Sequence, residues 1–535
     1  MWWVLFIACA QKPAPVAEPP HDSGEHAALT HGEQHGPVHP DDIAHWVRRM
    51  SFDLRGLPPS EADLERIRAA PEEWATVRTE YLSDANFRNR MVHLYTERWH
   101  TRVDVFDIVA FDYGLDAEEE YAFERSVGEE PLRIIAEVIA TDQPWDQVVT
   151  ANWTMANEML GTLWPIDYPD GATGWQPSHY NDGRPSAGVL STNGMWWRYT
   201  TTTANMNRRR AATISRLLLC EDYLARPVAF SEADTSNSTT ADAAQEDPYC
   251  LACHSSLDPI AASLFGFWWL SQYSEIEETT YHPEREALWQ EYLGVAPGWY
   301  GTPISGLPDL GVSIARDSRF YSCAVESLAE TLWRRETTID DATTLEDLRV
   351  AFLESGTTIR PLLAAITETA EYQNGTPRML THDQFNGSLE QLTGFRWTWD
   401  GFDQLDSDET GYRLLMGGVD GFSNKTPQQT PGLTWALVVK RAAEAAASYA
   451  VQNELIAEGE PLFFKHVTPI DRPGDAAFTN ELESLHLRLY GRVASDEWRT
   501  EITALWEAVH LEHGVSTAWS VTGAVMLRDP AFLSY

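Results

Sequence analysis

The chain has 535 residues and a formal net charge of −41, from 39 Lys and Arg against 80 Asp and Glu. This charge argues against nucleic acid and anionic membrane surfaces as partners, and it favours cationic partners or an acidic solvated surface. A hydrophobic content of 43% indicates a globular protein, and the length exceeds one ordinary core, so we expect several domains.

The first nine residues resemble a bacterial lipoprotein signal. Residues 2–8 are apolar and precede Cys9, which in such a signal is lipidated and becomes the mature N-terminus. The match is incomplete, because no Lys or Arg precedes the apolar run. Residues 10–40 are rich in His and Pro and predict a disordered tether. We expect an exported protein anchored by lipid in the bacterial envelope, in the periplasm or at the outer surface. No other stretch is apolar and long enough to span a membrane.

Helical spacing begins near Asp41. One helix is expected to end near Leu54, and the next begins at Ser60 with Asp63 in a capping-box pattern. Gly491 followed by Ser495 predicts a similar joint. Long alternating apolar and polar segments are absent from the sequence, so we expect few strands and a mainly α fold of several helical domains.

The most informative motif lies at residues 247–259, DPYCLACHSSLDP. Cys250, Cys253 and His254 have the spacing Cys-x-x-Cys-His. On a helical turn, two thiols at this spacing reach the two vinyl groups of one haem, and the adjacent imidazole reaches the iron. The sequence therefore predicts one covalently bound haem c, with His254 as the proximal iron ligand.

Other interpretations of the motif remain open. A zinc site needs a fourth ligand and usually a second Cys-x-x-Cys pair. A thioredoxin-like redox site needs a βαβ context. Cys250 and Cys253 can also form a strained structural disulfide. Two more cysteines, Cys220 and Cys323, are either a disulfide around the motif or two buried thiols.

The segment PYCLACHSSLDPIAASLFGF resembles the haem-motif segment of planctomycete-type cytochrome c-like proteins, a multidomain family with myxobacterial versions and domains of unknown function. In that family Asp-Pro follows the motif, as Asp258 and Pro259 do here. The resemblance covers residues 187–375 well and 45–535 loosely. Its Leu-Cys and Phe-x-x-Cys segments match the sequence at Cys220 and Cys323, which implies a disulfide between them.

The resemblance implies haem binding, but it supplies no reaction. The family's usual Gly-Phe-x-x-Glu-x-Phe-Asp is replaced by ASLFGFWWLSQY, which keeps an apolar haem wall of Phe265, Phe267, Trp268 and Trp269. It leaves the polar edge of the haem undefined. The expected organisation is given by the following ranges: a helical domain at 41–165, a haem-binding region at 187–294, a helical domain at 295–375 and a C-terminal helical domain at 378–535.

Further residues are candidates for contacts with the haem. Arg208 and Arg209 lie in a cationic run and would pair with the propionates, or with nearby acids of the helix. The distal iron ligand is expected to be Met195 or Met206. The other candidates are His179 and His282, and each of the four is also compatible with a structural role.

Three functions follow from these patterns. The first is an envelope-anchored haem c protein that transfers electrons to a redox partner protein, and the acidic chain favours a basic partner. The second is a peroxidase- or oxidase-like haem enzyme with an open distal site. The third is a surface binding or scaffold protein that carries a haem module. The paired acids Glu481 and Glu483 predict a solvated face and no acid–base chemistry.

Overall fold

Helices dominate the computed structural model, as the spacing of apolar residues predicts. The structure describes the following parts of the chain: residues 40–102, 110–226, 248–268, 281–407, 410–420, 424–428, 430–457 and 459–535. The predicted signal with Cys9 and nearly all of the predicted tether lie outside the described residues, as does Trp269. None of the helices in the described ranges is long and apolar enough to cross a membrane.

The N-terminal helices carry the predicted joint. Ser60 caps α2 by accepting from the backbone N–H of Asp63 at 3.1 Å, and Asp63 accepts from the N–H of Ser60 at the same distance. The capping box is therefore confirmed. The elements of this part are α1 (Pro40–Arg55), α2 (Glu61–Ala69), η1 (Pro71–Glu73), α3 (Trp74–Tyr81), α4 (Phe87–Trp99), η2 (Ala110–Tyr113), α5 (Ala117–Ala140) and α6 (Gln147–Thr150).

A small antiparallel sheet follows, in the order β1-β3-β2. Thr154 pairs with Ser178, and Ile166 pairs with Tyr180. Two of its strands, β2 and β3, lie within residues 166–180. The strands are short and poor in β-branched residues, so their pairing depends on distant contacts. The elements are β1 (Thr154–Ala156), α7 (Glu158–Leu163), β2 (Ile166–Asp167) and β3 (Gln176–Tyr180).

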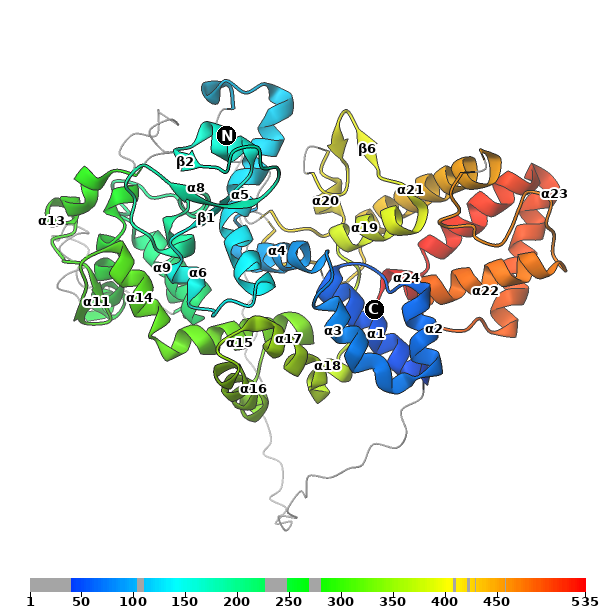
Figure 1. Ribbon diagram of the computed structural model, residues 1–535, viewed down its shortest axis with the longest axis horizontal. Coiled ribbons are helices and arrows are strands. Elements are labelled where there is room, and N and C mark those ends of the chain that lie inside the picture. The colour runs from blue at the N-terminus through cyan, green and yellow to red at the C-terminus, as the bar shows by residue number, and fades with distance from the viewer. Residues whose placement is uncertain are drawn as a thin grey trace, which may run out of the picture. The chain divides into compact units, whose positions relative to one another are not determined.

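The middle of the chain places the Cys-x-x-Cys-His motif on α11, which packs against α9 and β4. The elements of this part are η3 (Gly188–Ser191), α8 (Asn193–Arg198), α9 (Arg208–Leu219), η4 (Tyr223–Ala225), α11 (Pro248–Ala262), η5 (Phe265–Phe267), η6 (Pro283–Leu288), α13 (Trp289–Tyr292), β4 (Gly298–Trp299) and β5 (Thr302–Pro303). Figure 1 shows α9, α11 and α14 on the same side of the unit formed by residues 40–535.

A disulfide joins the next helices to this region. Cys220, which directly follows α9, is bonded to Cys323 of α15, as the resemblance implies. The elements of this part are α14 (Leu307–Ala315), α15 (Ser318–Trp333), η7 (Ile339–Asp341), α16 (Ala342–Glu354), α17 (Ile359–Glu368) and α18 (Ala370–Gln373).

The C-terminal part is helical as predicted. Gly491 ends α22 with a φ of 69°, and the side chain of Ser495 caps α23. The predicted joint is therefore present. Glu481 is fully buried, so the prediction of a solvated face is wrong for this residue. The elements are α19 (His382–Thr393), β6 (Thr398–Trp399), β7 (Phe402–Asp403), α20 (Tyr412–Leu415), α21 (Leu433–Ala450), the π-helix η8 (Val451–Ile456), α22 (Ala476–Tyr490), α23 (Asp496–Leu527) and α24 (Pro530–Leu533).

Residues 40–535 form one compact unit with two hydrophobic cores. The first core runs from Ile43 to Tyr372 in the sequence and takes in Leu487. It is shared by the regions expected at 41–165, 187–294 and 295–375. The second core takes Leu380 and later residues together with Phe52 of α1. Figure 1 shows α1 beside the C-terminus, and the Arg48 guanidinium donates to the carbonyl of Phe532 at 2.7 Å.

Candidate functional site

The helix α11 presents the motif residues along one stripe. Cys250, His254 and Asp258 are spaced four residues apart, and Cys253 lies three residues after Cys250. Residues at these spacings neighbour one another on a helix surface. Both thiols are free and half-buried. The helix thus carries two thiols, an imidazole and a carboxylate on one face.

Asp258 holds the His254 imidazole in one orientation. Nδ1 of His254 lies 2.9 Å from Oδ1 of Asp258. Burial opposes ionisation of Asp258, but hydrogen bonds from Arg208 and His254 outweigh it and hold the pKa of this carboxyl below its usual value. An ionised carboxylate only accepts hydrogen bonds, so Nδ1 carries the proton. In the neutral ring, the lone pair is then on Nε2.

Arg208 completes this arrangement from another helix. Its Nε and Nη2 atoms lie 2.7 and 2.9 Å from the two carboxylate oxygens of Asp258, a bidentate pair. Asp258 is only 2% exposed, so its charge needs such a partner. Helix α9 begins at Arg208 after Met206 and Asn207, which have left-handed φ values of 52° and 64°. The backbone N–H of Asn207 is fixed by the Thr201 hydroxyl at 2.7 Å. This turn sets where Arg208 enters the site.

The arginines that follow Arg208 have different surroundings. Arg209 is exposed, and its backbone N–H donates to Asn205. Arg210 is fully buried and donates to the carbonyls of Tyr199, Phe267 and Trp196. Arg210 therefore ties α9 to α8 and η5. The predicted pairing of Arg208 and Arg209 with haem propionates stays a prediction, and Arg208 already has a carboxylate partner within the protein.

The aromatic residues after the motif form a buried cluster. Phe265, Phe267 and Trp268 are each 0% exposed. The rings of Phe265 and Trp268 lie 4.6 Å apart in an edge contact, and those of Phe267 and Tyr281 lie 4.9 Å apart. The residues expected to form an apolar wall are buried and pack against other aromatic rings. Their contact with a haem stays a prediction.

Pro259 also has a packing role. It lies inside α11, where it removes one helical N–H donor. A Cβ atom built on Gly298 of β4 would lie 3.2 Å from the Cβ of Pro259. The glycine thus allows β4 to approach α11 closely at the end of the motif.

The candidate distal ligands are dispersed among different elements. Met195 is 1% exposed within α8, and Met206 is half-buried in the turn before Arg208. Nδ1 of His179 lies 2.9 Å from the carbonyl of Asn152. Nδ1 of His282 lies at the same distance from Oε1 of Glu284. Met206 is the candidate linked most directly to the motif, because its turn leads into the arginine that binds Asp258.

The described residues lend no support to the other interpretations of the motif. Within them, no group of three or more His, Cys, Asp or Glu side chains is placed to hold one metal ion, as a zinc site requires. The strands that the structure describes pair antiparallel, whereas a thioredoxin-like site needs a parallel βαβ unit. A haem attached through thioether bonds differs from a zinc site, because among the motif residues only His254 would bind the metal.

The pairing that organises the site follows only in part from local sequence patterns. The spacing of His254 and Asp258 is four residues, which on a helix signals a side-chain contact. Arg208 lies 50 residues earlier, and no local pattern joins it to Asp258. Only the packing of α9 on α11 brings them together.

Comparison with known proteins adds no identification, because no family model, no curated protein and no solved structure matches this chain.

Proposed function

We propose that the chain binds one haem c through Cys250 and Cys253, with His254 as the axial iron ligand, and that it transfers electrons. The observation that carries this proposal is the orientation of His254. Its Nδ1 is bound to Asp258, on a helix face that also presents two free thiols. Histidines that bind metals usually donate their second ring nitrogen in this way.

The residues around His254 would fit it for this role. Asp258 holds the tautomer with the lone pair on Nε2, and a carboxylate hydrogen-bonded to the ligating histidine in this way favours oxidised iron. Arg208 balances the buried charge of Asp258. When bound, haem c would supply an iron centre that gains and loses one electron. The chain's contribution is to hold the imidazole, the two thiols and the buried aromatic cluster in place.

The proposed location is outside the cytoplasm. The Cys220–Cys323 disulfide supports it, because such bonds persist in oxidising compartments. Anchoring through Cys9 rests on the sequence alone. A basic redox partner is proposed because the chain carries a net charge of −41. Membership of the planctomycete-type cytochrome c-like family likewise remains a proposal, based on the motif segments.

The attachment of haem can be tested on denatured protein. The chain would be produced in a bacterial host with cytochrome c maturation, denatured, and analysed by haem-dependent peroxidase staining and intact mass. We expect the haem to stay with the wild-type chain and to be lost from the double variant Cys250→Ala/Cys253→Ala.

A matched control uses the other cysteine pair. Cys220→Ala/Cys323→Ala also removes two thiols, but it leaves the motif intact and is expected to keep the haem. Haem retained by Cys250→Ala/Cys253→Ala, or zinc present in place of haem in the wild type, would contradict the proposal.

A further inference from the structure

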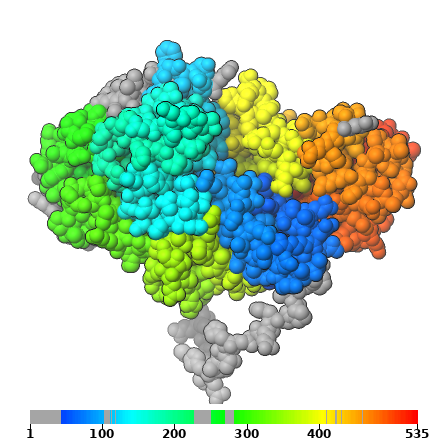
Figure 2. Space-filling view, in the orientation of Figure 1, coloured from blue at the N-terminus to red at the C-terminus, as the bar shows by residue number. Residues whose placement is uncertain are grey.

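A polar cavity of about 410 Å³ lies far from the motif in the sequence. Its walls come from the end of α1, from α4 and α5, and from α19 with the segment that follows it. The volume is within the range of small-molecule sites, about 300 to 1,000 Å³. In the space-filling view, the blue surface of the N-terminal helices adjoins the yellow surface of the α19 region (Figure 2). The cavity is large enough for a ligand of the size of a disaccharide.

The charged groups at this cavity balance one another. Six arginines line it, and each forms an ion pair, so that six guanidinium groups face six carboxylates in all. A charged ligand would therefore have to displace an existing partner, and it would gain no free counter-charge. The six are Arg55, Arg90, Arg102, Arg125, Arg133 and Arg396.

The ion pairs also hold the wall formed by α5 in place. Arg125 and Arg133 lie four residues before and four residues after Glu129, and they pair with it at 2.8 and 2.6 Å. Glu129 is 5% exposed, so its charge needs these partners. The charged groups are thus committed to one another, and the hydrogen-bonding capacity that remains for a ligand belongs to neutral side chains.

Two of these neutral side chains come from the start of α4. Asn86 directly precedes the helix and Asn89 lies in its first turn, and both line the cavity. The side-chain oxygen of Asn89 accepts from Arg133 at 2.6 Å, which leaves its NH₂ group to donate to a ligand. The NH₂ group of Asn86 donates to Asp84 at 2.9 Å, which leaves its oxygen to accept. This wall therefore offers an uncharged donor and an uncharged acceptor.

A third amide comes from α19. Nε2 of Gln391 donates to the carbonyl of Pro58 at 3.4 Å, which leaves Oε1 as an acceptor. Gln391, Asn86 and Asn89 are all exposed. Ligand groups would therefore replace water at these amides, and no buried contact would have to break.

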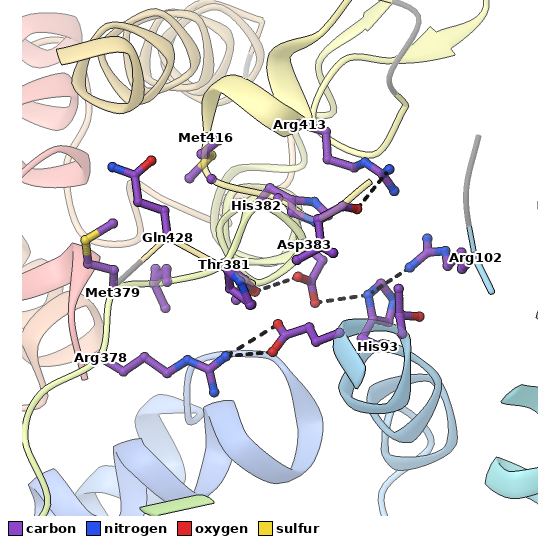
Figure 3. A pocket seen from close by; sticks show the side chains of 17 residues that line it. His93, Arg102, Arg378, Met379, Thr381, His382, Asp383, Arg413, Met416 and Gln428 are labelled. Carbon is purple, nitrogen blue, oxygen red and sulfur yellow. Dashed lines mark hydrogen bonds and ion pairs between the residues drawn. The ribbon is translucent and has the colours of Figure 1, made fainter. Parts of the chain in front are cut away.

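A second, smaller pocket meets the cavity at His93, Arg102 and Asp383, which line both. Figure 3 shows Asp383 between His93 and Thr381. Nδ1 of His93 lies 3.1 Å from Asp383, and the Thr381 hydroxyl donates to the other carboxylate oxygen at 2.5 Å. Asp383 is therefore engaged by protein groups, and it does not offer a free charge to a cationic ligand.

We propose that this cavity binds a neutral polyhydroxylated ligand, such as a small sugar. A hydroxyl group both donates and accepts hydrogen bonds, so it suits the donor at Asn89 and the acceptors at Asn86 and Gln391. Because the charges of the walls are already paired, a neutral ligand binds without separating them. The proposal does not depend on haem binding, because none of these residues belongs to the motif region.

The test is saturation-transfer-difference NMR of the purified full-length chain, with maltose, cellobiose and lactose as separate probes. We expect at least one of these disaccharides to give a signal that saturates with its concentration. Inorganic phosphate, followed by the width of its phosphorus resonance, is expected not to bind. Asn89→Ala and Gln391→Ala are each expected to weaken the binding of the sugar about fivefold, the usual effect of losing one neutral hydrogen bond.

The control is Asn374→Ala, because Asn374 is also an exposed amide but does not line the cavity. We expect it to bind the sugar within about twofold of the wild type. All three variants change exposed polar side chains, so each is expected to fold. Absence of saturable binding for all three disaccharides, binding of phosphate in their place, or sugar binding that neither Asn89→Ala nor Gln391→Ala weakens more than Asn374→Ala would overturn the proposal.

Discussion

Asp258 connects α9 and α11, the two helices of the proposed haem site. It accepts hydrogen bonds from His254 on its own helix and from Arg208 on α9. The chemistry of the imidazole and the packing of α9 on α11 therefore depend on the same carboxylate. A change at this position is expected to affect both stability and redox behaviour.

The substitution Asp258→Asn would leave Arg208 facing a neutral amide. We expect the free energy of unfolding to fall by about 3 kcal/mol, the usual cost of breaking a buried ion pair. In the haem-loaded protein the reduction potential should rise, because the ligating imidazole loses its hydrogen bond to a negatively charged partner. Urea denaturation and a redox titration measure the two effects. Glu346→Gln, which breaks the exposed pair with Arg349, is the matched control. Equal free energies of unfolding and equal reduction potentials for Asp258→Asn and Glu346→Gln would contradict the role assigned to Asp258.

Glu481 should make stability depend on pH. Burial raises the pKa of this carboxyl from 4.5 to about 7. The folded chain then binds more protons than the unfolded chain in this interval, so its contribution to stability is present below about pH 4.5 and lost as the pH rises to about 7. In the wild type, this titration should lower the free energy of unfolding by roughly 3 kcal/mol over this interval. In Glu481→Gln we expect that decrease to be absent. Urea denaturation at several pH values measures it, and an identical pH slope in both proteins would be evidence against the shift.

The disulfide between Cys220, directly after α9, and Cys323 of α15 links two helical segments covalently. Its two cysteines are 103 residues apart and enclose α11. Cys220→Ala/Cys323→Ala is expected to lower the free energy of unfolding by about 3 to 5 kcal/mol, because a long loop gains freedom in the unfolded chain. Urea denaturation under oxidising conditions checks this. A loss below about 1 kcal/mol would show that the bond does not constrain the unfolded chain.

The elements differ in how far the sequence could predict them. The joints at Ser60 and Gly491 depend on capping residues a few positions apart, so local patterns were sufficient. Few strands are expected and few are found, but no local pattern locates β1, β2 and β3, because short strands without alternation depend on distant partners. The contact of His254 with Asp258 is implied by helical spacing, whereas the partner Arg208 follows only from tertiary packing. The burial of Glu481 also results from packing and could not be derived from its charged neighbours.

The whole molecule depends on a buried polar cluster where the two hydrophobic cores meet. Asp53 of α1 is 0% exposed. It accepts hydrogen bonds from the hydroxyls of Tyr372 and Tyr535, at 3.0 and 3.1 Å, and lies 3.3 Å from the Arg334 guanidinium. Tyr535 is the last residue, and its ring packs on Phe52 with centroids 4.7 Å apart. One carboxylate thus links both cores and the C-terminus.

Asp53→Asn should weaken this link. We expect a loss of about 3 to 5 kcal/mol in the free energy of unfolding, since Arg334 would be left without its buried counter-charge. The milder control Tyr535→Phe removes one hydrogen bond and should lose about 1 kcal/mol. Urea denaturation followed by tryptophan fluorescence and circular dichroism compares them. A smaller loss for Asp53→Asn than for Tyr535→Phe would be inconsistent with a central role for the carboxylate.

Covalent haem binding by this chain can be detected in an absorption spectrum. The wild-type chain would be purified from a host with cytochrome c maturation, and spectra recorded before and after addition of dithionite and as the pyridine adduct. We predict sharp α and β bands on reduction and a pyridine adduct typical of two thioether bonds. A colourless protein, or a haem that organic solvent extracts from the denatured chain, would contradict the claim.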